Sequence, residues 1–558
     1  MKEPTEEQIK NPGDNEKEPT SYNLTSTNEP VGPTPEELET LPRIADKIPY
    51  TIFMVVIAEA AERFTFRSIT GPLQNYVQNP LHDDRLPGAL GKGQATATAI
   101  GYFFQCWCFL MPIVGAVIAD CYLGRVKTIL LGSITATIGT LILFLTSLPV
   151  SLENGAGWPG LLVALIIIGL GAGGIKSNVG PLVADQYTGK KPVVKITADN
   201  RRVILDPDVT VQTIYSRYYW LINIGSCAGL IAPWVERKVG FWATFLIPLC
   251  IYGCATVVLI FCRNKYSEKR CLMKDWCHCS QELVIRPPQG SIAIRAAHAL
   301  WIGFKKNRTM DHAKPSYLRQ QGEQIDLPWD DQFVDEIKVA LMACRVISLF
   351  PIFWLCYGNT VGNLISLAGL MNTMGLPNDF LAGSINPLSI LILLPLFERV
   401  IYPSLRRINI PFRPISRITF GFVIMSGAIA VAAGLQSLAY NSPPYSVNFL
   451  SILPIYVLTA LSEITAFLSS MEYAYTKAPR SMKSLVASVN LLLCALGSLL
   501  GLAISPTSKK PQILVQFACL SSIMFLAAIL VYVLFSKYNK VDEKMNQIER
   551  EADSDREG

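Results

Sequence analysis

Twelve apolar stretches, each close to the length of a helix that crosses a lipid bilayer, occupy most of this chain. Only 16% of the 558 residues are charged, whereas soluble domains contain about 25% charged residues. The sequence therefore predicts an all-α, multi-pass membrane protein. The twelve stretches are residues 49–77, 95–119, 125–149, 159–186, 211–234, 239–262, 339–369, 380–404, 413–436, 448–476, 483–505 and 511–536.

A long polar segment divides these stretches into two sets of six. We predict a first half over residues 48–262, a cytoplasmic middle loop over 263–338 and a second half over 339–536. Two such halves are typical of transporters whose halves rock around a central site. Residues 1–47 are rich in Glu and Pro and lack the apolar core of a signal peptide, so we expect a disordered tail. Residues 537–558 form a second tail.

Lysine and arginine residues between the stretches gather on one side of the membrane if the helices alternate in direction. They lie near 125–127, 190–202, 406–417 and 477–483, and in the middle loop. The basic residues at 237–238 and 509–510 lie on the other side and are outnumbered. Since basic loops stay in the cytoplasm, the sequence predicts that both termini are cytoplasmic.

Charged residues inside the apolar stretches indicate a function. Lys176 lies in the fourth stretch, where an unpaired lysine costs about 3 kcal/mol. Glu59, Glu62 and Arg63 lie in the first stretch, three and four residues apart, so their side chains project along one helix face. Glu463 lies in the tenth stretch. Residues of both signs within membrane helices predict an ion or proton pathway, in which a glutamate pairs with Lys176.

The four histidines all lie outside the apolar stretches. A proton carrier inside the membrane must therefore be a buried carboxyl group, and Glu59, Glu62 and Glu463 are the candidates. A static cluster of charges that holds helices together is the alternative interpretation.

An enzyme or a metal protein is not expected. The sequence contains no nucleophile with a positioned base and no nucleotide-binding loop. Cys271, Cys277, His278 and Cys279 lie in the middle loop, but they lack the paired C-x-x-C spacing of a structural zinc site. We therefore expect no metal, no cofactor and no nucleic-acid partner.

Several motifs resemble those of one transporter family. EAAERF begins at Glu59, and the runs GAVIADCYLGRVKT, GAGGIKSNVGPLVADQY, YYWLINIGS and LSEITAFLSSMEYAYTKAP follow in the expected order. FW at Phe353 and Trp354 and INP at 385–387 also match. Over about residues 48–536 the chain resembles the proton-dependent oligopeptide transporters of fungi, a branch of the major facilitator superfamily. The resemblance implies twelve transmembrane helices in two six-helix halves.

The resemblance also implies roles for individual residues. Proton coupling is implied for Glu59, Glu62, Arg63 and Lys176. In peptide binding, Arg63 and Lys176 hold the carboxylate and Glu463 receives the amino terminus. Asn223 and Asn386 hydrogen-bond the peptide backbone, and Trp354 forms a wall of the side-chain pocket. Asp120 and Arg125 belong to a gating loop.

The residues themselves leave some of these roles open. A buried tryptophan such as Trp354 is as typical of core packing as of a pocket wall. Asn223 could instead make a hydrogen bond between helices, a common use of asparagine in membrane spans. Gly169, Gly171, Gly173 and Gly174 predict a close approach between helices.

The chain departs from the family pattern in its first and second spans. Phe66 and Arg67 stand where the family commonly has two tyrosines, and Phe109 stands at another tyrosine position. Arg67 lies four residues after Arg63, so the two cations repel each other unless an anion lies between them. We expect Glu59, Glu62 or a substrate carboxylate in that place, and Arg67 in the substrate site.

The resemblance implies a proton-coupled symporter of di- and tripeptides that works by alternating access. The proton gradient is its driving force, and we expect a monomer in the plasma membrane. Two alternatives stay open: transport of a peptide-derived metabolite, nitrate or other small anion on the same fold, and a peptide sensor that does not transport.

Overall fold

The computed structural model of the chain describes residues 41, 43–46, 50–83, 85–186, 192–196, 202–267, 292–305, 309–321, 327–408, 412–479 and 482–557. Within these residues, each of the twelve predicted stretches is helical. In the described part of the chain, nine helices are long and apolar enough to cross a membrane, and a bent pair makes a tenth. The first and fifth stretches are also helical but more polar.

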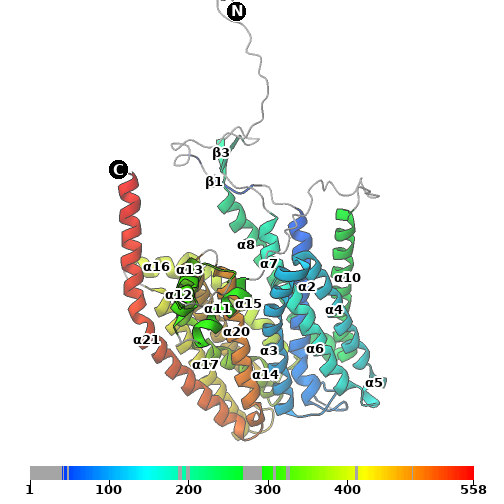
Figure 1. Ribbon diagram of the computed structural model, residues 1–558. Helices are drawn as coiled ribbons and strands as arrows, with labels where there is room; N and C mark the ends of the chain where they lie inside the picture. The colour runs from blue at the N-terminus through cyan, green and yellow to red at the C-terminus, as the bar shows by residue number, and fades with distance from the viewer. Residues whose placement is uncertain are drawn as a thin grey trace, which may run out of the picture. The chain divides into compact units, whose positions relative to one another are not determined.

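The first half contains the helices of the first six stretches (Figure 1). They are α2 (Tyr50–Gln78), α3 (Gln94–Ile118), α4 (Arg125–Thr146), α6 (Gly157–Lys176) followed by α7 (Val179–Asp185), α8 (Pro207–Ser226) followed by α9 (Ala228–Lys238), and α10 (Phe241–Ser267). The short helix α5 (Pro149–Glu153) connects α4 and α6.

The second half contains the other six. They are α14 (Phe350–Gly369), α15 (Phe380–Leu396) extended by η4 (Phe397–Ile401) and α16 (Tyr402–Arg407), α17 (Pro414–Asn441), α18 (Leu453–Ser462) extended by η6 (Glu463–Leu468) and α19 (Ser469–Lys477), α20 (Lys483–Ile504) and α21 (Gln512–Glu557). α21 continues well past residue 536, where we placed the end of the last span.

The seventh predicted stretch, 339–369, is not one helix, and this prediction is corrected. α13 (Asp331–Cys344) begins earlier, and the helical segment that ends at Ile347 meets α14 at an angle of 45°. Pro351 lies in the first turn of α14, where a proline favours the start of a helix and opposes its continuation from the preceding one. The predicted single helix is therefore two helical segments, with the break just before Phe350.

The middle loop is partly helical in its described residues. α11 (Ile292–Lys305), η2 (Met310–Ala313) and α12 (Pro315–Gln320) precede α13. Trp329 Nε1 donates to the Ala313 carbonyl over 3.1 Å, and Lys314 Nζ lies 2.8 Å from Asp335 Oδ1. The candidate metal ligands Cys271, Cys277, His278 and Cys279 lie outside the described residues.

A small sheet forms a unit of its own. β1 (Arg43–Ile44) pairs in parallel with β3 (Arg202–Leu205), which pairs antiparallel with β2 (Val193–Ile196). Residues 43–44 therefore differ from the disordered tail that we predicted over 1–47, whose first 40 residues lie outside the described residues. Strand pairing between segments so far apart leaves no local pattern in the sequence.

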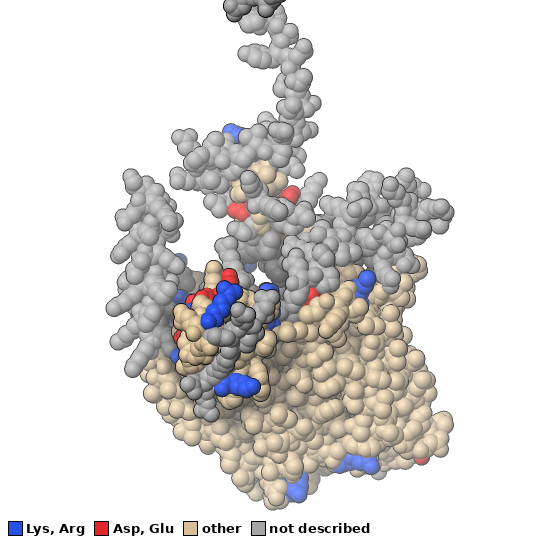
Figure 2. Space-filling model, in the orientation of Figure 1, with Lys and Arg blue, Asp and Glu red and all other residues tan. Residues whose placement is uncertain are grey.

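Side chains of the bundle face either a packed interior or an apolar exterior. Tyr76, Phe104 and Phe245 are buried in the first half, and Phe350 and Phe422 in the second. On the face drawn in Figure 2, uncharged residues cover a broad band and the lysine and arginine side chains lie at its margins. This distribution is typical of a protein surrounded by lipid.

Glycines bring α3, α4 and α6 into close contact, which confirms the predicted role of the glycine-rich run. A Cβ atom on Gly115 would lie 2.2 Å from the Gly173 carbonyl oxygen, and one on Gly171 would lie 2.6 Å from that of Gly132. These distances are shorter than any normal contact, so side chains are excluded there.

We therefore predict that Gly115→Ala destabilises the bundle. Overpacking of this kind costs about 1–3 kcal/mol, so the thermal unfolding midpoint in detergent should fall. Gly253→Ala in α10 is the matched control because no atom lies within 4 Å of its added methyl group. An unchanged midpoint for Gly115→Ala would contradict the packing argument.

Candidate binding cavity between the two halves

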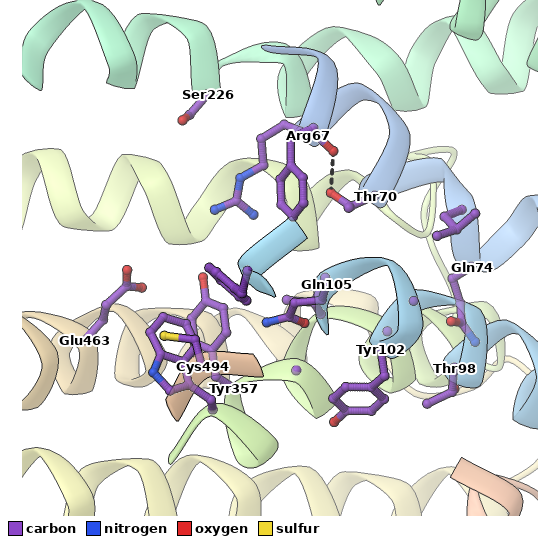
Figure 3. Close-up of a pocket in the computed structure, with 18 of the residues that line it drawn as sticks. Arg67, Thr70, Gln74, Thr98, Tyr102, Gln105, Ser226, Tyr357, Glu463 and Cys494 are labelled. Carbon is purple, nitrogen blue, oxygen red and sulfur yellow. Dashed lines mark hydrogen bonds between the residues drawn. The ribbon is translucent and has the colours of Figure 1, made fainter. Parts of the chain in front are cut away.

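A cavity of about 340 Å³ lies between the two halves, within the size range of small-molecule sites. Figure 3 shows side chains that line it, from helices of both halves. From the first half they include Arg63, Phe66, Arg67, Gln74, Tyr102, Gln105, Phe109 and Ser226. From the second half they include Trp354, Tyr357, Glu463, Phe467, Asn490 and Cys494.

The charged residues of α2 form one cluster with Lys176. Lys176 Nζ lies 3.0 Å from Glu62 Oε1, so the predicted pairing of this lysine with a glutamate of the first span is confirmed. Arg63 Nε donates to Glu59 Oε1 over 3.2 Å and lies 3.7 Å from Glu62 Oε2. Both glutamates are 1% exposed, whereas the Arg63 side chain is 38% exposed and lines the cavity. The cluster thus reaches from the protein interior to the cavity.

Two phenylalanines cover Lys176. Its Nζ lies 4.6 Å from the ring centroid of Phe66 and 5.9 Å from that of Phe109. A cation at this distance from an aromatic ring is attracted to it, more strongly where water is excluded. The two rings therefore form an apolar cover over the Glu62–Lys176 pair.

Glu463 lies on the opposite wall, at the first residue of the π-helical turn η6. π-helical turns occur mostly as local bulges and are frequent at functional sites. Asn386 Nδ2 lies 3.3 Å from Glu463 Oε2 and 3.0 Å from the Tyr357 hydroxyl. Asn386 does not line the cavity. Its amide therefore holds the Glu463 carboxylate in position from the side away from the cavity.

Arg67 lines the cavity, but the anion near it is not the one that we expected. Its guanidinium group lies near the Tyr357 hydroxyl and the Glu463 carboxylate and acts electrostatically on both. In Figure 3, Arg67 and Glu463 project from opposite walls into the same space. The protein anion that meets Arg67 therefore belongs to the second half, because Glu59 and Glu62 are already held by Arg63 and Lys176.

The two residues with open interpretations lie in different surroundings. Trp354 lines the cavity, and its ring centroid is 5.2 Å from that of Phe467 and 5.3 Å from that of Tyr357. Asn223 in α8 does not line the cavity, but Ser226, almost one turn further on, does.

The proposed gating residues lie at the junction of α3 and α4. Asp120 is in a π-helical turn, η1 (Ala119–Leu123), and Arg125 begins α4. Gly124 separates them with a positive φ of 75°, a conformation that suits glycine. This tight turn places the arginine close enough to the aspartate for electrostatic attraction.

A hydrogen-bond network that sequence reasoning missed joins the halves beyond the cavity. We call the end of the bundle where α2 begins, at Tyr50, the near end, and the one where α2 finishes, at Gln78, the far end. Toward the far end, Ser366 Oγ donates to Gln78 Oε1 over 2.5 Å, and Thr98 Oγ1 donates to Asn363 Oδ1 over 2.9 Å. These bonds hold the two halves together on that side.

Tyr102 of α3 extends this network into α14. Its hydroxyl donates to the Leu355 carbonyl over 2.8 Å and accepts from Asn359 Nδ2 over 2.6 Å. Asn359 and Asn363 are four residues apart on one helix face. In the sequence, the only sign of this network was the spacing of these two asparagines within an apolar stretch.

Comparison with known proteins places the chain in a family. The model of the POT family matches residues 126–533. Peptide transporter PTR_A of Candidozyma auris is 38% identical over 534 residues, covering 93% of this chain and 86% of the relative. Peptide transporter PTR2 of Saccharomyces cerevisiae is 35% identical over 548 residues, covering 96% of this chain and 87% of the relative.

Solved structures show the same fold. The crystal structure of the POT family transporter PepTSo superposes with a TM-score of 0.68 at 21% identity, covering 89% of this chain and 99% of the other. A POT family transporter in complex with 5-aminolevulinic acid gives a TM-score of 0.63 at 18% identity, covering 88% of this chain and 96% of the other. With its two six-helix halves and the match over most of its length, the chain belongs to the POT family.

Proposed function

We propose that this protein is a symporter that couples the uptake of small peptides to protons by alternating access. The observation that carries the proposal is the cavity between the halves, which has Arg63 on the wall of the first half and Glu463 on that of the second. Relatives that match almost the whole chain are named peptide transporters. A membrane enzyme lacks support from these relatives.

The charges of the cavity suit a zwitterion. A peptide has a carboxylate at one end and an ammonium group at the other, and the cavity has Arg63 and Glu463 on walls of different halves. Arg67 lies in the neighbourhood of Glu463. A peptide amino group would take over this carboxylate and free Arg67, so cargo binding would exchange a contact between the halves for contacts with the cargo.

Protons would act through the Glu62–Lys176 pair. A proton on Glu62 removes its negative charge and weakens the 3.0 Å ion pair, which frees Lys176. Because an unpaired charge in such a place is costly, loss of the proton or binding of a cargo carboxylate would restore the balance. One proton that crosses 100 mV supplies about 2.3 kcal/mol, enough for nearly fiftyfold accumulation of a neutral cargo.

The orientation follows from the basic loops. We place the near end, with both termini, in the cytoplasm of the cell and the far end outside, in the plasma membrane. The far-end network then closes the outer side. We propose that one chain forms a complete transport path, since the cavity is lined by the two halves of one molecule.

Reconstitution in proteoliposomes tests the proposed function. We expect an inward proton gradient to drive accumulation of a labelled dipeptide, and a protonophore to abolish it. The control is the same vesicle without protein. Binding of the dipeptide without flux driven by the gradient would instead identify a sensor.

We predict that Glu62→Gln abolishes accumulation but retains counterflow, the exchange of labelled for unlabelled cargo at equal pH. Glutamine keeps the shape and hydrogen bonding of a protonated glutamate but cannot release a proton. Counterflow in the same preparation serves as the control for folding. If Glu62→Gln still concentrates cargo against its gradient, Glu62 does not couple transport to protons.

A second candidate function is the transport of an acidic peptide-derived metabolite or another small anion. Arg67 favours it, because a second arginine faces the cavity where the family commonly has a tyrosine. The solved relative in complex with 5-aminolevulinic acid is a POT family transporter with a small amino acid bound.

We predict that Arg67→Tyr shifts selectivity toward neutral dipeptides and weakens acidic cargo. The substitution removes a cation from the cavity and leaves Glu463 without this partner. Competition for uptake across a dipeptide panel measures the shift. Arg67→Lys keeps the charge and should retain the parent's order of preference. The same profile for Arg67→Tyr and the parent would exclude Arg67 as a specificity residue.

A further inference from the structure

A buried cluster of two acids and two amides joins the halves at the far end, away from the cavity. Glu236 lies in α9 of the first half, and Asp379 precedes α15 of the second. Asn75 Nδ2 donates to Glu236 Oε1 and to Asn378 Oδ1, both over 2.9 Å, and Asn378 Nδ2 donates back to Asn75 Oδ1 over 2.9 Å. Glu236 is 2% exposed and Asp379 is fully buried.

The backbone brings these acids together. A Cβ atom on Gly229 of α9 would lie 2.2 Å from the Gly383 carbonyl oxygen of α15. Ser384 Oγ donates to the Gly229 carbonyl over 3.1 Å. The two helices therefore touch at glycine, and the cluster can form only while the far end is closed.

Neither carboxyl group has a basic partner among the described residues. Arg237 Nη1 donates instead to the Leu376 carbonyl, and Lys238 Nζ lies 5.5 Å from the ring centroid of Trp234. Of the neighbouring tyrosines, Tyr456 on α18 lies near enough to Asp379 to feel its charge, and Tyr76 on α2 packs on Phe241. The charge that acts on Glu236 is that of Asp379.

Two carboxylates cannot both stay ionised in such a place. Glu236 Oε2 and both Asp379 oxygens receive no hydrogen bond from an N–H or O–H group of the described residues. One proton held between the two carboxyl groups would remove one of the two negative charges and supply a donor to these buried oxygens. Burial raises the pKa of each carboxyl group, and both residues lie just outside the apolar stretches 211–234 and 380–404.

We propose that Glu236 and Asp379 form a second proton-binding site, which holds one proton while the far end is closed and loses it when the far end opens. The proposal rests on the alternating access of the proposed function. Opening separates α9 from α15, and each carboxylate is then hydrated and charged. Closing buries both, so it requires a proton.

This proton differs from the one assigned to Glu62. It is bound from the far side and returns to the far side, so it is not transported. Its effect is on the equilibrium between open and closed states. Because the closed state binds one proton more, the closed-to-open ratio falls by up to about tenfold per pH unit as the pH rises.

A pair of cysteines across the far end can measure the closed-to-open ratio, and this measurement does not require transport activity. Gln78→Cys and Ser366→Cys replace two residues whose side chains touch across the halves. The rate at which their disulfide forms, followed by mass spectrometry of the linked peptides, measures closure. The same pair is placed in the parent and in Glu236→Gln, so the pH dependence of thiol chemistry cancels in the ratio of the two rates.

We predict that the parent-to-Glu236→Gln rate ratio falls by up to about tenfold per pH unit as the pH rises, because the glutamine amide donates to Asp379 at any pH. Glu153→Gln, at an exposed carboxyl group on the same end of the bundle, should follow the parent. Asp379→Asn is the second variant if Glu236→Gln does not fold.

Two outcomes would overturn the proposal. One is the same pH dependence of closure in the parent and in the variants at Glu236 and Asp379. The other is a lower proton-to-cargo ratio in Glu236→Gln, measured from reversal potentials, which would make this proton a transported one. Absence of all transport would contradict the proposed function instead and would leave the cysteine measurement valid.

Discussion

The ion pair between Glu62 and Lys176 is the interaction on which the rest of the structure depends. It joins α2 to α6 in the middle of the first half, where neither charge is tolerated alone. Removal of one partner from a buried pair costs about 3–5 kcal/mol, much more than the pair contributes to stability. The pair is therefore a weak source of stability but a strong constraint, because any step that separates it must supply another charge or a proton.

Most of the fold could be predicted from the sequence because a membrane helix is defined locally. An apolar stretch of sufficient length must be helical, whatever surrounds it, and the charges within 49–77 and 159–186 had to face the interior. The bend before Pro351 and the pairing of β1 with β3 were not predicted. Both depend on where distant segments lie, which hydropathy does not report.

The candidate site could be predicted only in part, because some of its contacts join segments that are far apart in the sequence. The cluster of Glu62 and Lys176 follows from the need to neutralise a lysine inside the membrane. The partner of Arg67 was not predictable, because helical spacing points to Glu59 and Glu62, while the structure uses Glu463 of the other half. Glu236 and Asp379 lie at the ends of apolar stretches, where a charged residue is ordinary and indicates nothing by itself.

The contacts between the halves are numerous but individually weak. Hydrogen bonds between membrane helices contribute on average about 0.6 kcal/mol each, because the separated groups find other partners. A far end closed by bonds such as those of Gln78, Asn363 and Tyr102 can therefore open without a large barrier. Reversible closure needs this kind of contact, whereas an apolar seal of the same area would not reopen in water.

The charge balance of the cavity region limits what it can carry. Arg63, Arg67 and Lys176 are matched in number by Glu59, Glu62 and Glu463, and each group has a partner of opposite sign. A zwitterion leaves this balance unchanged, since its two ends replace one anion and one cation of the protein. A cargo with an extra negative charge disturbs the balance unless a proton accompanies it. The number of protons that move with each cargo is therefore tied to the cargo's charge through these carboxylates, of which Glu463 meets a cation of the other half.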